Sequence, residues 1–320
     1  MGPTLEQIDA AAATLRGKTV ETPVLPLSQA RWQGVLPDAD VSLKLELFQQ
    51  TGSFKARGAY LGIAGLGAAD RAAGVVAASG GNHAMAVAWA AQEAGVDALI
   101  AMPKATDPDR VAGCKALGAR VILCDDMPAA FAVMQDEADK GRFLMHPFEG
   151  AHMTLGSAVI GQEYLAQAPE VDTFVIPIGG GGLISGMACA IKQLKPDAKV
   201  IGVEPVGADS MTRSFAAGAP VTLDKIDTIA DSLGAPMAMP YSFGVAHRFV
   251  DDIVHVTDAQ MVAAMGHYGN NLRIMAEPAC AASLAAICGP LRDAVQGQRV
   301  GIIACGSNIG LARYNALMAG

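Results

Sequence analysis

Short apolar segments alternate with helical segments through residues 74–145, and this alternation constrains the fold more than any other feature. Each apolar segment is only three or four residues long, and a turn separates it from the helical pattern beside it. Three strand–helix units within about 75 residues predict a compact parallel sheet with helices on its faces. The expected strands are 75–78, 98–101, 121–123 and 143–145, and the expected helices are 84–93, 128–140 and one that Asp107 and Pro108 open as N-cap and N1.

A second alternating block follows, and the two blocks together predict two α/β domains that face each other. The chain has 320 residues, of which 52% are apolar, so it can bury a core in each domain. A helix at 5–16 and a strand at 41–47 precede the first block, whereas residues 219–256 are less regular. In the second block we expect helices at 156–168, 183–194, 258–269, 278–288 and after residue 308, and strands at 173–176, 199–203 and 300–305.

A lysine stands between aromatic and small residues in the stretch 50–59 (QTGSFKARGA). The alternating run before it predicts a strand, so the stretch predicts a tight turn and a helix start with Ser53 as the N-cap. Lys55 in the first turn does not favour stability, because the helix dipole there disfavours cations. The same field lowers the pKa of the amine, and a neutral amine is the form that condenses with an aldehyde. A solvated surface lysine is the alternative, and it is the commoner outcome for a lysine taken alone.

Four consecutive glycines lie between an expected strand and an expected helix. Such a loop can turn its backbone N–H groups inward, and the helix N-terminus adds positive potential, so the pattern predicts a phosphate cradle. The dinucleotide fingerprint is absent, since its third glycine would fall on Ile184 or Ser185, and no Lys-Ser/Thr pair of a Walker loop follows. A purely steric turn is the alternative. The four residues are Gly179, Gly180, Gly181 and Gly182.

Two further loops stand at strand ends, where open α/β sheets bind ligands. The first loop can hold a carboxylate on its N–H groups, and its asparagine can donate to a ring oxygen. Ordinary helix capping is the alternative there, and a structural role is the alternative for its histidine. The second loop begins with Cys305, which taken alone is equally a small buried hydrophobe. The loops are Ser79, Gly80, Gly81, Asn82 and His83, and Cys305, Gly306, Ser307 and Asn308.

Charge and composition exclude several classes of protein. The net charge is −8 and no basic block is present, so we expect no nucleic-acid partner. No apolar run reaches about 18 residues and no secretory signal is evident, so we expect neither a membrane span nor secretion. The six cysteines form neither a CxxC pair nor a Cys/His cluster, and we therefore expect reduced thiols in a cytoplasmic protein.

Four segments together resemble the serine/threonine dehydratase and serine racemase family of pyridoxal-phosphate enzymes. They are residues 51–59, 79–83, 179–182 and 305–308, and the resemblance covers essentially the whole chain in order. It implies an α/β fold with two open twisted sheets flanked by helices, similar to tryptophan synthase β and known as fold type II. The implied domains are a large cofactor-binding domain of residues 1–73 and 150–320 and a small substrate-side domain of residues 74–149.

The resemblance also implies the roles of the site residues. Lys55 would bind pyridoxal 5′-phosphate through a Schiff base and then act as the base at Cα of the substrate. Residues 79–83 would hold the substrate. The cofactor would contact Phe54 and Glu277 beside its ring, Asn82 at the ring hydroxyl, Gly179, Gly180, Gly181 and Gly182 at the phosphate, and Cys305 at the pyridine nitrogen.

The implied reaction is β-elimination from a 3-hydroxy-L-amino acid such as L-threonine or L-serine, giving a 2-oxo acid and ammonia. Racemases of this family carry a serine second in the first loop, where this chain has Gly80, which cannot move a proton; we predict a dehydratase rather than a racemase. Ser157 and Ser232 depart from the family pattern and indicate a reshaped substrate pocket. A 3-hydroxyaspartate dehydratase, an amino-acid racemase, a β-replacement synthase and a catalytically silent ligand-binding protein stay open as alternatives.

Two further expectations concern a cation and the assembly. Family members often bind Mg²⁺ or another divalent cation through a glutamate, a backbone carbonyl and an acid. Glu204 and Ala208 match the first two positions, but Ser210 stands at the third and Asp209 is displaced by one. A hydroxyl or water can complete an oxygen site, so the cation stays open against an ordinary surface loop. We also expect an amino-acid substrate as the ligand and a homo-oligomer, in the form of a dimer.

Overall fold

A computed structural model gives the fold of residues 2–320 and places their strands in two separate sheets. The larger sheet has six strands in the order β1-β2-β10-β7-β8-β9. All neighbours in it pair in parallel except β1, which is antiparallel to β2 at one edge. Its strands are β1 Val24–Pro26, β2 Asp40–Lys44, β7 Thr173–Pro177, β8 Lys199–Pro205, β9 Asp252–Val256 and β10 Arg299–Ile303.

The smaller sheet has four parallel strands in the order β5-β4-β3-β6. They are β3 Val75–Ala78, β4 Ala98–Pro103, β5 Arg120–Cys124 and β6 Phe143–Leu144. Alternate residues of β3 point to opposite faces, because side chains in a strand repeat every two residues. Val75 and Ala77 pack into one core and Val76 and Ala78 into another, so both faces of this sheet are covered.

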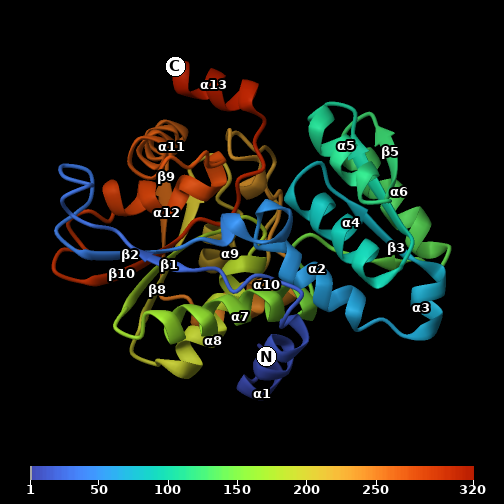
Figure 1. The fold of residues 1–320 in the computed structure, drawn as a ribbon, viewed down its shortest axis with the longest axis horizontal. Helices are drawn as coiled ribbons and strands as arrows, with labels where there is room; N and C mark the ends of the chain where they lie inside the picture. Colours follow the sequence, from blue (N-terminus) through green and yellow to red (C-terminus); the bar gives the residue numbers. More distant parts are fainter. Residues whose placement is uncertain (1) are drawn as a thin grey trace.

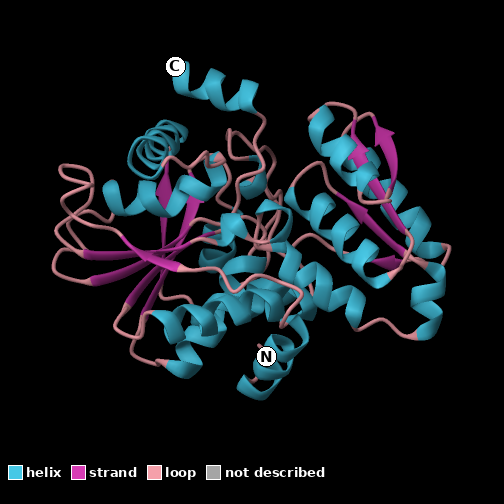
Figure 2. Ribbon diagram, in the orientation of Figure 1, coloured by secondary structure: helices cyan, strands magenta, loops and turns pink. Residues whose placement is uncertain are grey.

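Helices cover both faces of each sheet (Figures 1 and 2). α7 and α8 lie below the larger sheet in Figure 1, and α11 and α12 lie above it. In the smaller unit α4 packs in one core and α6 in the other. The helices are α1 Leu5–Leu15, α2 Lys55–Ala64, α3 Ala68–Ala73, α4 Asn82–Ala94, α5 Pro108–Ala116, α6 Met127–Asp139, α7 Ala151–Gln167, α8 Gly182–Leu194, α9 Ser210–Ala217, α10 Pro240–Phe249, α11 Asp258–Leu272, α12 Pro278–Cys288 and α13 Leu311–Ala319.

The predicted elements are largely confirmed, and the misses fall where the pattern is weak. β2 ends at Lys44 instead of residue 47, because a short 3₁₀ helix, Glu46–Phe48, turns the chain there. α7 begins at Ala151, five residues earlier than expected. The sequence did not predict α3, α9, α10, β1 or β9; of these, α10 and β9 fall within residues 219–256, which read as irregular.

α2 lies between the two units and packs against both. Its residues Ala56, Ala59 and Ile63 belong to a core of the smaller unit. On its other side, a Cβ added to Gly156 of α7 would stand 2.7 Å from the Cα of Gly58, so the two helices touch backbone to backbone. We propose two domains. The large domain comprises residues 1–73 and 150–320, and the small domain comprises residues 74–149. Helix α2 packs between them. No helix among residues 2–320 is both long and apolar enough to cross a membrane.

Candidate active site

The loops singled out in the sequence meet around one cavity of about 870 Å³. They come from the ends of β3, β7 and β10 and from the turn that precedes α2. Parallel strands end at one edge of a sheet, which explains how segments far apart in the chain reach one place. Of the residues predicted for cofactor and substrate, all of these line the cavity: Phe54, Lys55, Ser79, Gly80, Gly81, Asn82, His83, Gly179, Gly180, Gly181, Gly182, Glu277 and Cys305.

Lys55 lies in the first turn of α2, as predicted, and is the first residue of that helix. Its amine donates a hydrogen bond to the carbonyl of Pro147 and lies 5.0 Å from the centre of the Phe54 ring. Burial lowers the pKa of Lys55 to about 8, although Cys305 and Glu277 oppose the shift. A lowered pKa increases the fraction of neutral amine, which is the form that a Schiff-base lysine needs.

The prediction that Ser53 caps this helix is wrong. Phe54 occupies the N-cap position and makes no side-chain cap bond. Ser53 is extended, with φ −160° and ψ 158°, and forms a β-bridge with Gly306. Pairing with the loop after β10 therefore overrides the capping preference of serine, and the Ser53 hydroxyl is buried without a protein partner.

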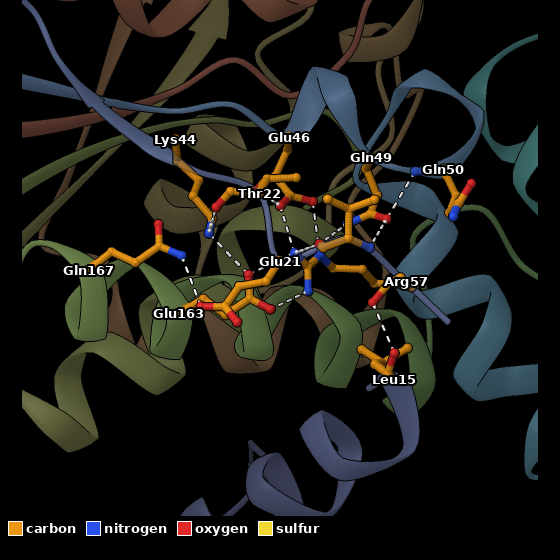
Figure 3. A network of polar contacts seen from close by, with 12 residues as sticks. Leu15, Glu21, Thr22, Lys44, Glu46, Gln49, Gln50, Arg57, Glu163 and Gln167 are labelled. Carbon is orange, nitrogen blue, oxygen red and sulfur yellow. Dashed lines mark hydrogen bonds and ion pairs between the residues drawn. The ribbon is translucent and has the colours of Figure 1, made fainter. Parts of the chain in front are cut away.

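A buried ion network holds the other side of α2 (Figure 3). The Arg57 guanidinium donates two hydrogen bonds to Glu46, at 2.8 and 2.9 Å, and two to Glu163, both at 2.8 Å. Lys44 donates to Glu163 at 3.0 Å, and the Thr22 hydroxyl donates to Glu46. Although burial acts to raise it, Arg57 holds the pKa of Glu46 below its ordinary value. This network, named the α2 ion network below, fixes the start of the helix that carries Lys55.

Asn82 is oriented by three partners. Its amide nitrogen donates to Glu277 at 2.7 Å and to the Ser232 hydroxyl at 3.3 Å, and its amide oxygen accepts from Asn308 at 2.7 Å. Asn308 donates a second bond, at 2.7 Å, to the carbonyl of Thr51, in the turn before Lys55. The three motif loops are thus tied together through side-chain amides.

The loop after β3 presents backbone N–H groups at the start of α4. The Ser79 hydroxyl accepts from the Gly81 N–H at 3.1 Å and so shapes its own loop. His83 bonds the Met145 carbonyl through Nε2 at 2.8 Å, while its buried Nδ1 has no protein partner. Burial and the nearby Lys55 hold the pKa of His83 well below its ordinary value, so the ring is neutral.

The glycine loop fits a phosphate. It joins β7 to α8, and the first N–H groups of a helix have no intrahelical partner. Gly181 has φ 90°, a left-handed conformation that glycine adopts without strain. A side chain on Gly180 or Gly182 would clash with Phe148, so no side chain covers the backbone of this loop. A bare backbone at a helix N-terminus is the cradle that the sequence predicts.

Cys305 and Glu277 are both buried beside Lys55. The neighbouring Cys280 and burial hold the pKa of the Cys305 thiol well above its ordinary value, so the group is neutral. Burial raises the pKa of Glu277, whose second oxygen is buried without a protein partner. With the lysine, the glycine cradle and these unpaired polar atoms, the residues present fit pyridoxal phosphate.

The residues proposed for a divalent cation do not fit one as they stand. Both oxygens of Glu204 already accept hydrogen bonds at 2.7–2.8 Å from the start of α9, from the N–H groups of Met211 and Thr212 and from the Thr212 hydroxyl. Burial raises the pKa of Glu204 to about 7. Asp209 bonds Arg213 instead, and no group of three His, Cys, Asp or Glu suited to a metal occurs within residues 2–320.

Sequence reasoning missed several residues of the cavity wall. Thr106, Arg110, Phe131 and Phe148 all line it, and no motif marks them. They lie in the turn before α5, on α5, on α6 and in the segment before α7, respectively. Ser232 lines the cavity as expected. Ser157 does not line it; it is buried in α7 and donates to the Met153 carbonyl at 3.1 Å.

Comparisons with known proteins agree with this geometry. The family described as pyridoxal-phosphate dependent enzyme matches residues 16–306. Phenylserine dehydratase of Ralstonia pickettii is 43% identical, covering 98% of this chain and 95% of that protein. L-threonine ammonia-lyase of Thermotoga maritima is 36% identical, covering 96% of this chain and 76% of that protein. The solved structure of maize serine racemase superposes with a TM-score of 0.92 at 33% identity, covering 100% of this chain and 98% of that one.

Proposed function

Because this chain belongs to the family of pyridoxal-phosphate dependent enzymes, we propose that it eliminates the β-hydroxyl of a 3-hydroxy-L-amino acid and converts it to a 2-oxo acid and ammonia. The wider class, β-elimination or racemisation of amino acids, follows from its relatives. The observation that carries the finer proposal is the pairing of Lys55 with Gly80 in one cavity. Lys55 supplies a base, whereas Gly80 offers no side chain that can return a proton to Cα.

The chain's own residues divide the work. When bound, the cofactor would supply an aldehyde for the substrate amine and a ring that draws electrons from Cα. N–H groups of the glycine loop would hold its phosphate, and Asn82 and the neutral Cys305 would contact its ring. The Lys55 amine takes the Cα proton, and the loop after β3 holds the carboxylate. The β-hydroxyl leaves as water, and hydrolysis of the resulting enamine gives the 2-oxo acid and ammonia.

A racemase is the second candidate, and one contact favours it. A Cβ added to Gly80 would stand 2.5 Å from the Thr106 hydroxyl, so a serine does not fit at position 80 while Thr106 keeps its place. The Thr106 hydroxyl lies close to where a serine side chain would begin, and it offers the same chemical group. If the enzyme racemises L-serine, Thr106→Val should abolish D-serine formation and leave ammonia release in place.

The cavity wall favours an apolar substituent on Cβ of the substrate. Met127 and Phe131 of α6 line the cavity together with Phe148. A volume of about 870 Å³ is ample for a side chain larger than that of serine or threonine. The relative from R. pickettii is named for phenylserine. We therefore rank phenylserine above L-threonine and L-threonine above L-serine, with 3-hydroxyaspartate last.

Lys55→Ala tests the reaction. The purified wild-type protein should show an absorbance band of a lysine–cofactor Schiff base and release ammonia from 3-hydroxyamino acids. The variant should lose the band and at least about 10⁴-fold of the turnover rate. Lys104→Ala removes a lysine whose side chain is 64% exposed and should change neither property. A wild-type band without turnover on any amino acid would instead indicate a ligand-binding protein.

A substrate panel tests the ranking. We expect kcat/KM to fall in the order phenylserine, L-threonine, L-serine, 3-hydroxyaspartate, each scored by its 2-oxo acid. Phe131→Ala should lower kcat/KM for phenylserine about tenfold and barely change that for L-serine, because only the larger substrate reaches this ring. Faster turnover of 3-hydroxyaspartate than of phenylserine would overturn the ranking.

Two proposals concern the setting of the enzyme. All six cysteines are free thiols, which suits the reducing cytoplasm that we propose as its location. We also propose a homodimer, which light scattering of the cofactor-loaded protein should show as twice the chain mass of 32.8 kDa.

A further inference from the structure

Arg110 lines the cavity and bridges two loops beside it. It belongs to the first turn of α5, on the side of the four-stranded sheet. One end of its guanidinium donates to the carbonyl of Gly80 at 3.1 Å, and the other donates to the carbonyl of Asn308. Gly80 is in the loop proposed to hold the substrate carboxylate, and Asn308 is in the loop after β10 of the six-stranded sheet. A single side chain therefore joins the two halves of the site.

The partners of Arg110 leave its charge unpaired. No carboxylate within residues 2–320 forms a salt bridge with it, unlike Arg313 on the same wall, which pairs with Asp231 at 2.5 Å. Its Nε is buried without a protein partner. A Cβ on Gly81 would lie 3.8 Å from its Nη1, so the positive charge stands beside the backbone of the loop. An unpaired guanidinium there favours a carboxylate on that loop.

The second contact of Arg110 links it to the lysine. Asn308, whose carbonyl Arg110 binds, also holds Asn82 and the turn at Thr51 through its side-chain amide. Thr51 has φ 59°, a left-handed conformation that threonine adopts only when its surroundings hold it. The planar guanidinium of arginine can donate to both carbonyls at once, whereas the ammonium of a flexible lysine side chain does so less well.

We infer that Arg110 is a positioning residue that sets the carboxylate-binding loop against the Lys55 side of the site. This inference rests on the proposed function, since it concerns the carboxylate of the same substrate. It assigns Arg110 to substrate affinity rather than to cofactor binding, because neither carbonyl that it holds belongs to the glycine loop.

Ligand titration of the cofactor-loaded enzyme tests the inference without turnover. L-alanine lacks a leaving group and carries the carboxylate, whereas alaninamide lacks the carboxylate. Arg110→Met should weaken L-alanine binding about tenfold and leave alaninamide within about twofold. Arg110→Lys, which restores the charge without the fork, should weaken L-alanine about threefold. Arg120→Met is the control, since Arg120 is 56% exposed at the start of β5 and bonds Asp97; it should bind both ligands like the wild type.

The kinetic readout should agree. On the best 3-hydroxyamino acid, Arg110→Met should raise KM about tenfold and change kcat less than about threefold, with the cofactor Kd unchanged. Equal losses for L-alanine and alaninamide, or a loss of cofactor affinity, would overturn the inference. Wild-type affinity for L-alanine in Arg110→Met would overturn it as well. Absence of ammonia release from every substrate would defeat the proposed function instead, and the titration would still decide the role of Arg110.

Discussion

Two buried polar clusters adjoin the helix that carries Lys55, and they differ in how their atoms are paired. In the α2 ion network, formed by Thr22, Lys44, Glu46, Arg57 and Glu163, every side-chain nitrogen and oxygen that is buried bonds another protein group. In the second, here named the pocket cluster, each member keeps one buried nitrogen or oxygen without a protein partner. Its members are Thr51, Ser53, His83, Arg110 and Glu277.

The contrast separates polar groups that stabilise from polar groups that bind. A buried polar atom without a partner costs free energy, and native proteins keep few of them. The α2 ion network avoids that cost by pairing two cations with two carboxylates inside the protein. The pocket cluster accepts that cost at the cavity wall, where His83, Arg110 and Glu277 lie, and in the adjoining turn that carries Thr51 and Ser53. Unpaired polar atoms at the cavity are what a site for a polar ligand requires. Substitutions in the first cluster should therefore change stability, and those in the second should change binding.

The largest effect on stability should come from Arg57→Met. Arg57 is fully buried, and its removal leaves Glu46 without its cation and Glu163 with Lys44 alone. We expect a loss of about 3–5 kcal/mol in the free energy of unfolding of the cofactor-free protein, measured in urea. Arg299→Met is the matched control, because its pair with Asp172 is 52% and 34% exposed and should contribute less than about 1 kcal/mol. Equal losses in the two variants would break the comparison.

Lys55 itself should make stability depend on pH. Burial lowers its pKa to about 8 in the folded protein, against 10.5 as the ordinary value. Between these two pH values the unfolded chain binds the extra proton, so the contribution of Lys55 to the stability of the cofactor-free protein should rise with pH from about 8 upward. The buried cysteines act in the opposite direction, because burial raises the pKa of Cys114, Cys189 and Cys288 in the folded protein. Urea unfolding of the wild type and of Lys55→Met between pH 7.5 and 9.5 separates the two effects, and the stability of the wild type relative to the variant should rise with a slope approaching about 1.4 kcal/mol per pH unit. A difference that stays constant over this range would contradict the lowered pKa of Lys55.

The sequence predicts the pocket far better than it predicts the network. Lys55, Asn82 and the glycine loop follow from local patterns, because strand ends and helix starts place such residues at one edge of a sheet. Arg57 stands two residues from Lys55, yet nothing local shows that it meets Glu163 on α7, 106 residues away. The predicted N-cap role of Ser53 is wrong for the same reason, since its bridge to Gly306 is a long-range contact that overrides the local capping preference of serine. Helix α10 was missed because it lies in the segment 219–256, which reads as irregular.

A matched pair of hydroxyls sharpens the comparison at smaller scale. The Thr22 hydroxyl donates to Glu46, whereas the Ser53 hydroxyl is buried without a partner. Thr22→Val should cost about 1–2 kcal/mol of unfolding free energy, because a buried carboxylate oxygen loses a donor. Ser53→Ala should stay within about 0.5 kcal/mol of the wild type in the cofactor-free protein. The two urea midpoints decide the matter, and a Ser53→Ala loss as large as that of Thr22→Val would contradict it.

Chelation should have the smallest effect, because Glu204 resembles the α2 ion network rather than the pocket cluster. Both of its oxygens are already bonded by the start of α9. A cation at 100 times its Kd would add about 2.7 kcal/mol, so removing one would lower the melting temperature by several degrees. We expect EDTA to shift it by less than about 1 °C. Ser210→Asp would place a second carboxylate in this buried region, and Mg²⁺ should then raise the melting temperature of the variant alone. A wild-type protein destabilised by EDTA would show instead that a cation displaces the bonds of Glu204.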